Sequence, residues 1–166
     1  MKKRGSRLLK KSLHAVINAA FTVIILTGAA IAGLRVCGIQ LYSVLTGSME
    51  PGLPVGSICL IDRRYSFSEL IPGDIITFRL SDDSVVTHRA VRIIGDTVYT
   101  RGDANNAEDS SPVTEEGYIG KCILSLPKTG YIVRFIRSRI GLPLLAALIV
   151  FLIAADRCLG RAGPDK

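Results

Sequence analysis

The chain is organised around the stretch Ser43-Val44-Leu45-Thr46-Gly47-Ser48-Met49-Glu50-Pro51-Gly52-Leu53. The apolar, β-branched run at 41–45 predicts a strand. Gly47 ends that strand with a residue that tolerates unusual backbone angles, and a Pro-Gly turn signal follows it. We therefore expect Ser48 at a strand exit, exposed and held in a fixed position. Those are two requirements of a serine nucleophile, although many ordinary turns share them.

The sequence that follows this stretch predicts an all-β domain. Short apolar and β-branched runs alternate with turn residues, among them Ser81-Asp82-Asp83 and Gly95-Asp96. No window in this central region has a convincing helical period. The predicted strands are 40–46, 57–62, 74–80, 85–94, 97–101 and 118–124.

Charge and hydropathy are distributed unevenly along the 166 residues, which carry a net charge of +7 and 48% hydrophobic residues at a mean hydropathy of +0.37. Residues 1–34 hold six basic side chains and no acidic one. Residues 36–127 hold twelve acidic and seven basic side chains. Residues 128–166 hold two acidic and seven basic side chains. Positive charge thus flanks apolar ends around an acidic centre, which indicates membrane topology and argues against a nucleic-acid partner.

The N-terminal apolar stretch has no charged residue from Ser12 to Leu34 if His14 is neutral. At ~1.5 Å per residue it is long enough to cross roughly 30 Å of hydrocarbon. We expect a basic cytoplasmic tail at 1–12 and a transmembrane helix at 13–34. The alternative is a cleavable signal peptide with Ala30-Ile31-Ala32 as its A-x-A site, but the apolar stretch is longer than such peptides usually have.

The C-terminal part predicts a second membrane segment. A basic amphipathic segment at 132–139 is expected to lie at the interface. The uncharged apolar run that follows predicts a transmembrane helix at 140–156 and a cytoplasmic tail at 157–166, since flanking arginines can snorkel. A re-entrant or interfacial helix is the alternative. Residues 35–131 would then be extracytoplasmic, in a multi-pass protein of the cell membrane with the lipid bilayer as a partner.

Four short motifs carry a resemblance to a known family. Thr46-Gly47-Ser48-Met49-Glu50-Pro51 resembles the nucleophile box of type I signal peptidases. The other three follow in family order: Pro72-Gly73-Asp74-Ile75-Ile76, Val86-Thr87-His88-Arg89-Ala90-Val91 and Arg101-Gly102-Asp103-Ala104-Asn105-Asn106-Ala107-Glu108-Asp109. With histidine in the third motif, the chain resembles the endoplasmic-reticulum type of this family, which is found also in archaea and some Gram-positive bacteria. The common bacterial type has lysine at that position.

The resemblance implies a mainly β fold, a coiled β-sheet catalytic domain between N-terminal and C-terminal transmembrane helices. It also implies a membrane-bound serine endopeptidase that cleaves signal peptides from exported preproteins after small residues. No cofactor or metal is expected. Contact with the secretion machinery is left open. A catalytically silent membrane-tethered β module for binding or assembly is the rival interpretation.

The choice of base follows from exclusion as well as from the motif. There is no lysine between Ser12 and Gly120, so a serine–lysine dyad would need Lys121 or Lys128. Of the two histidines, His14 lies in the N-terminal apolar stretch. His88 is therefore the only imidazole in the central domain, and imidazole suits general-base work near neutral pH.

The remaining site residues are predicted from position in the motifs. Asp109 resembles the third catalytic member, and Asp103 resembles a supporting residue. A calcium loop is the alternative for these carboxylates, but the spacing lacks the glycine and glutamate of an EF-hand. The expected oxyanion donors are the Ser48 backbone N–H and the Thr46 hydroxyl. A shallow substrate pocket or, equally, a core role is predicted for Met49, Leu45 and Leu53.

Two further features leave alternatives open. Leu126-Pro127-Lys128-Thr129-Gly130 matches the L-P-x-T-G sorting signal of Gram-positive surface proteins, but arginines soon interrupt the apolar stretch behind it. Cys59 and Cys122 both fall in predicted strands, so they are either a disulfide or two buried free thiols.

Overall fold

The computed structural model describes residues 2–161, and the side chains of residues 14–157 apart from 132, 137, 152, 155 and 156. One structural unit is Leu34–Arg134, and the helical ends of the chain make up the other. The predicted tails at 1–12 and 157–166 fall almost entirely on residues or side chains outside this description.

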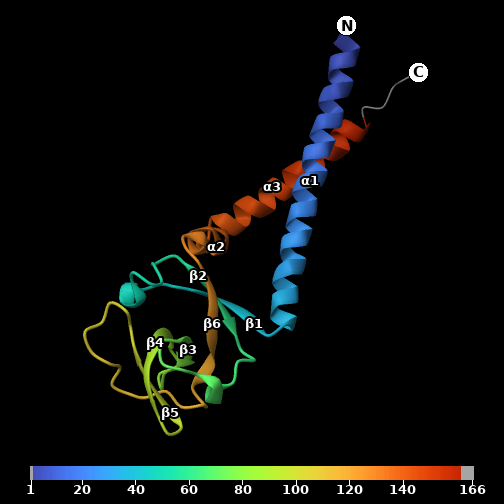
Figure 1. Ribbon diagram of the computed structural model, residues 1–166. Coiled ribbons are helices and arrows are strands. Elements are labelled where there is room, and N and C mark those ends of the chain that lie inside the picture. Colours follow the sequence, from blue (N-terminus) through green and yellow to red (C-terminus); the bar gives the residue numbers. More distant parts are fainter. Residues whose placement is uncertain (1, 162–166) are drawn as a thin grey trace. The chain divides into compact units, whose positions relative to one another are not determined.

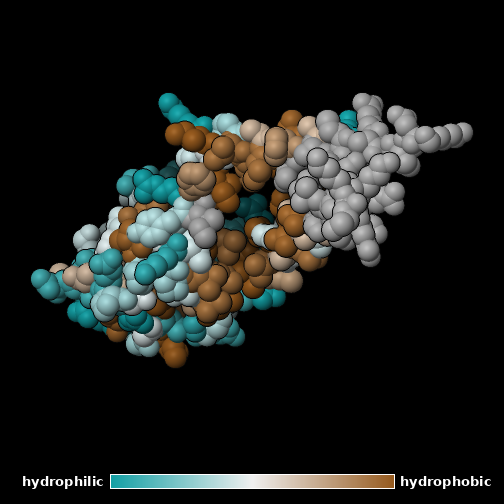
Figure 2. Space-filling view, turned by 90° about the horizontal axis from the view of Figure 1, so that it is seen from above, coloured by the Kyte–Doolittle hydropathy of each residue, from teal (hydrophilic) through white to brown (hydrophobic). Residues whose placement is uncertain are grey.

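The N-terminal apolar helix is present as α1, Lys2–Val36. Within the described residues, His14–Val36 is the one segment whose length and composition would allow it to cross a membrane. Most of its described apolar side chains are exposed, among them Val23 by 62% and Ile25 by 67%, whereas Ile17 is buried. Figure 2 shows apolar residues, in brown, exposed on the face of the molecule that it draws. A helix with this exposure needs an apolar environment to cover it.

Two helices follow the sheet, α2 at Thr129–Arg137 and α3 at Gly141–Arg161. The apolar part of α3 within the described residues is Gly141–Phe151, which is shorter than a membrane span. A helix therefore exists where the second transmembrane segment was predicted, at 140–156, but a span is not shown.

The central unit is mainly antiparallel β-structure, as predicted. Its six strands form one sheet in the order β1-β2-β6-β3-β4-β5, and all neighbours are antiparallel (Figure 1). The strands are β1 Ile39–Ser43, β2 Ile58–Asp62, β3 Ile75–Arg79, β4 Val85–Ile94, β5 Thr97–Arg101 and β6 Tyr118–Leu126. The strand that comes last in the sequence thus lies in the middle of the sheet, between β2 and β3.

Several strand ends differ from the prediction by one residue, and two differ by more. β1 stops at Ser43 rather than at residue 46, because the chain turns toward Ser48 after one more ladder-like bond, from the Val44 N–H to the Ser57 carbonyl. β6 continues to Leu126, two residues beyond the prediction. The L-P-x-T-G match is therefore folded: it begins in β6 and ends at the buried Gly130 in α2.

Two apolar clusters hold the sheet together. One, the hairpin cluster, packs β3, β4 and β5 against the loop at 111–117 and consists of Leu70, Ile76, Phe78, Ala90, Val98 and Val113. The other, the turn cluster, consists of Met49, Leu53, Cys59 and Ile61. The turn cluster contains two residues from the segment that carries Ser48, so that segment is packed into the core rather than being a free loop.

Candidate active site

Ser48 lies in a single 3-10 turn, Gly47–Met49, just after β1. The Glu50 N–H closes this turn on the Gly47 carbonyl, and the Leu53 N–H donates to the Met49 carbonyl at 2.7 Å. The side chains of Met49 and Leu53 are only 1% and 2% exposed. Buried anchors directly after Ser48 therefore fix its backbone, while its own side chain stays half-exposed.

His88 is brought to Ser48 by the sheet. It lies in β4, opposite Ile76 of β3, and is 8% exposed. Its Nε2 is 3.1 Å from Ser48 Oγ, and its Nδ1 is 2.7 Å from Asp109 Oδ2. An ionised carboxylate only accepts hydrogen bonds, so Nδ1 carries the proton and donates it to Asp109. Nε2 then presents its lone pair to the Ser48 hydroxyl, which is the arrangement a general base requires.

Asp109 lies in the loop after β5, at a point where the loop comes back alongside the end of that strand. Its N–H donates to the Thr100 carbonyl at 2.8 Å. Its Oδ2 accepts from the Thr100 hydroxyl at 2.6 Å as well as from His88. The structure therefore brings together Ser48, His88 and Asp109, three of the predicted site residues, from positions 40 and 21 residues apart.

Asp103 lies elsewhere in the same loop and bonds to a different partner. Its two oxygens accept from Arg89 Nε at 2.8 Å and Arg89 Nη2 at 2.7 Å, and Arg89 Nη1 donates to the Gly73 carbonyl. The bond to Asp103 raises the pKa of Arg89. Asp103 is bonded to Arg89, whereas Asp109 is bonded to His88. The two carboxylates therefore do not converge on one point as calcium ligands would.

The loop that carries Asp103 also contacts the turn Gly47–Met49 directly. The Ala104 N–H donates to the Ser48 carbonyl at 2.9 Å. Two glycines permit this approach: a Cβ on Gly102 would lie 2.4 Å from the Ser48 carbonyl oxygen, and one on Gly52 would lie 2.4 Å from Asp103 Oδ2. The Gly102 backbone is thus in contact with the Ser48 backbone, and the Gly52 backbone with the Asp103 side chain, at positions where only a hydrogen fits.

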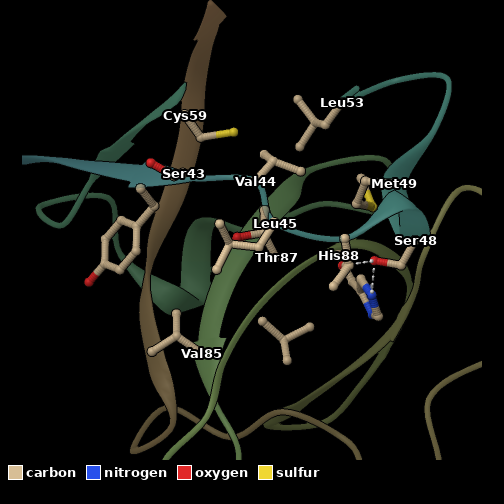
Figure 3. A pocket seen from close by; sticks show the side chains of 13 residues that line it. Ser43, Val44, Leu45, Ser48, Met49, Leu53, Cys59, Val85, Thr87 and His88 are labelled. Atoms are coloured by element: carbon tan, nitrogen blue, oxygen red, sulfur yellow. Dashed lines mark hydrogen bonds between the residues drawn. The ribbon is translucent and has the colours of Figure 1, made fainter. Parts of the chain in front are cut away.

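An apolar cavity of about 300 Å³ opens beside Ser48 and His88. Figure 3 shows these two side chains at one end, joined by their hydrogen bond, with Ser43 and Cys59 toward the other. The Thr46 hydroxyl, one predicted oxyanion donor, is 3.4 Å from Ser48 Oγ. The complete lining is Tyr42, Ser43, Val44, Leu45, Thr46, Ser48, Met49, Leu53, Cys59, Val85, Val86, Thr87 and His88. The three residues predicted for a substrate pocket are therefore all in the lining.

The Lys121 side chain forms an ion pair with Asp74. Its Nζ is 2.8 Å from Asp74 Oδ1 and 4.2 Å from the centre of the Tyr65 ring. The hydrogen bond to Asp74 raises the pKa of Lys121, so this lysine keeps its proton. A serine–lysine dyad through Lys121 therefore has no support in the geometry.

The two cysteines of the central sheet are free thiols on neighbouring strands, Cys59 in β2 and Cys122 in β6. A hydrogen bond between them, together with burial, raises the pKa of Cys59, and the same bond lowers the pKa of Cys122. Cys59 is 1% exposed, whereas Cys122 is only half-buried. The structure thus corresponds to the free-thiol interpretation, with one thiol less buried than expected.

Two contributors were missed by sequence reasoning, Thr100 and Arg89. Thr100 falls in a predicted strand where Val98 and Thr100 alternate with exposed or half-buried neighbours. That alternation places a hydroxyl on the buried face, where it needs a partner, and this was the available signal. Arg89 directly follows His88 and so points to the other side of the strand.

Comparison with known proteins gives one family. The family described as "Signal peptidase, peptidase S26" matches residues 15–116. "Signal peptidase I W" of Bacillus subtilis is 39% identical over 121 residues, covering 66% of this chain and 62% of that protein. "Signal peptidase complex catalytic subunit SEC11" of Metarhizium robertsii is 31% identical over 101 residues, covering 54% and 59%. The chain spans about three-fifths of the length of these curated relatives.

Proposed function

The chain belongs to the signal peptidase family, peptidase S26, and on this premise we propose that it is a membrane-bound serine endopeptidase that removes N-terminal signal peptides from exported preproteins. One observation carries the proposal: the hydrogen-bonded series Asp109–His88–Ser48 opens onto an apolar cavity. A series of this kind activates a serine for attack on a carbonyl carbon.

In the first half of the reaction, His88 Nε2 takes the proton of the Ser48 hydroxyl as Ser48 Oγ attacks the scissile carbonyl. The 3.1 Å separation places the two atoms within direct proton-transfer reach. The imidazolium that forms is stabilised by Asp109, 2.7 Å from its Nδ1. His88 then gives the proton to the leaving amine, and the signal peptide remains as an ester on Ser48.

In the second half, His88 Nε2 accepts a proton from the water that attacks the ester, and returns it to Ser48 Oγ as the signal peptide leaves with a free carboxyl terminus. Both tetrahedral intermediates carry an oxyanion that needs donors. We assign this role to the Ser48 N–H and the Thr46 hydroxyl. Thr46 Oγ1 is 3.4 Å from Ser48 Oγ. The oxyanion forms on the carbon that is bonded to Ser48 Oγ, so the Thr46 hydroxyl lies near enough to donate a hydrogen bond to it.

The lining of the cavity suits small apolar side chains. Leu45 contributes an exposed side chain to this lining, while Met49 and Leu53 contribute buried ones. We propose that small residues before the cleavage site occupy this cavity, as in A-x-A sequences. Cavities lined mainly by apolar groups bind by excluding water, so a charged side chain at those positions would be rejected.

Membrane anchoring completes the proposal. We propose that α1 spans the membrane, with residues 35–131 outside and α3 returning the chain as a second membrane segment. The positive charges before residue 12 and the exposed apolar surface of α1 support this orientation. Cysteines introduced at positions 5, 82 and 164, in a background with Cys37→Ser, would be labelled with a membrane-impermeant maleimide. Labelling of position 82 from the cytoplasmic side alone would refute it.

The enzymatic proposal is tested with the full chain in detergent. A preprotein is incubated with the wild type, Ser48→Ala, His88→Ala and the double variant, and the new N-terminus is sequenced. Because the two residues act as one unit, the double variant should be about as inactive as either single variant. Ser68→Ala removes an equally small hydroxyl from an exposed 3-10 turn and serves as the matched control. Wild-type cleavage by folded His88→Ala would refute the assignment.

A further inference from the structure

Thr100 is the one buried hydroxyl in contact with the Asp109 carboxylate among the described residues, and its own side chain is fully buried. Its Oγ1 lies 2.6 Å from Asp109 Oδ2, closer than His88 Nδ1 at 2.7 Å. Because the carboxylate only accepts hydrogen bonds, the Thr100 hydroxyl must donate. Hydrogen bonds to an ionised acceptor are roughly twice as strong as neutral ones.

Asp109 needs such a restraint because of its chemistry. The terminal torsion of an aspartate is soft, so the carboxylate rotates unless its oxygens are held. Here both donors meet on the same oxygen, Oδ2, and the Asp109 N–H is in turn bonded to the Thr100 carbonyl. Thr100 thus holds Asp109 at the backbone and at the side chain. Rotation of the carboxylate away from His88 would break the Thr100 hydroxyl bond as well.

We propose that Thr100 is a positioning residue of this site, which acts through Asp109 to fix the tautomer and orientation of His88. This inference rests on the proposed serine–histidine mechanism. Thr100 is not in the lining of the cavity, so its effect belongs to the chemical step and not to substrate binding. Loss of the hydroxyl leaves the imidazole able to rotate and to take the wrong tautomer, which lowers kcat.

The matched comparison is with another buried threonine. Thr77 in β3 is also 0% exposed, and its hydroxyl is bonded to Thr87 Oγ1 at 2.8 Å rather than to a carboxylate. Thr100→Val and Thr77→Val remove the same atom and keep the same shape. Both should lower the midpoint of thermal unfolding, Thr100→Val by more, because its hydroxyl bonds to a carboxylate and that of Thr77 to a neutral hydroxyl. A purely structural role of Thr100 predicts that the kinetics of the two folded variants are alike.

The experiment measures kcat and KM for preprotein cleavage by each folded variant of the full chain in detergent. We expect Thr100→Val to lower kcat roughly 10- to 100-fold with KM unchanged, as the loss of a charge-assisted hydrogen bond implies. Thr100→Ser, which keeps the donor, should recover most of the rate. In an Asp109→Asn background, Thr100→Val should have almost no further effect. Thr100→Ala, which also lacks the donor, replaces the valine variant if that protein does not fold.

Two results would overturn the inference while leaving the proposed function standing. One is a kcat for Thr100→Val equal to that of Thr77→Val, with Ser48→Ala inactive in the same assay. The other is a Thr100→Val effect of equal size with and without the Asp109 carboxylate. Activity of Ser48→Ala itself would instead refute the proposed mechanism on which the inference rests.

Discussion

Gly102→Ala should disable the site without touching any of its reacting groups. A Cβ at this position would lie 2.4 Å from the Ser48 carbonyl oxygen. Real Cβ atoms essentially never come closer than 3.0 Å to a non-bonded heavy atom. The loop and the nucleophile turn must therefore separate by at least 0.6 Å, against the 2.9 Å bond from the Ala104 N–H that holds them together. Ser48 Oγ would shift relative to His88 by a similar distance.

The size of the effect follows from that displacement. Misplacement of reacting groups by ~1 Å costs about 100-fold in rate, so we expect roughly a 10- to 100-fold fall in kcat. Crowding of the backbone should also cost about 1–3 kcal/mol of folding free energy. The assay is preprotein cleavage by full-length protein in detergent, with thermal unfolding measured in parallel. Gly28→Ala, where the new methyl meets nothing within 4 Å, is the control. Wild-type cleavage by Gly102→Ala would refute this account of how the turn and loop fit.

Three other variants test separate parts of the structure. His88→Lys should be nearly inactive in preprotein cleavage, because Asp109 would hold the ammonium protonated; a rate within tenfold of the wild type would contradict this. Asp103→Asn should lose about 1–3 kcal/mol of stability through its bonds to Arg89, with a smaller effect on the rate of folded protein; calorimetry alongside cleavage rates distinguishes the two. Thr129→Ala should leave protein size and membrane location unchanged on gels of cell fractions, and loss of a wall-linked form would show sortase processing.

The sequence predicted the sheet well because its signals are local. Alternating apolar residues and turn residues mark strands such as 85–94 and 97–101, and the structure has both at those bounds. The end of β1 was placed three residues too far, because Val44 and Leu45 are good strand formers in a segment that turns. The local strand preference of these residues favoured a longer β1. In the structure the chain turns instead, because Met49 and Leu53 are buried in the core.

The site was only partly accessible to the same reasoning. Motif order and the exclusion of other bases pointed to Ser48, His88 and Asp109, and the structure brings these three together. The bonds that hold them, from Thr100 and between Arg89 and Asp103, join side chains whose partners depend on register and on loop path. One sequence contains the residue types but not those pairings.

The position of β6 has a consequence for when the site exists. Ser48 belongs to the part of the sheet formed by β1 and β2, and His88 to the part formed by β3, β4 and β5, each a set of strands close in sequence. β6 joins the two parts within the sheet, yet it is the last of the six strands to be synthesised. A growing chain should thus contain both Ser48 and His88 before it can align them. The newly made protein is expected to stay inert until residues 118–126 arrive and close the sheet.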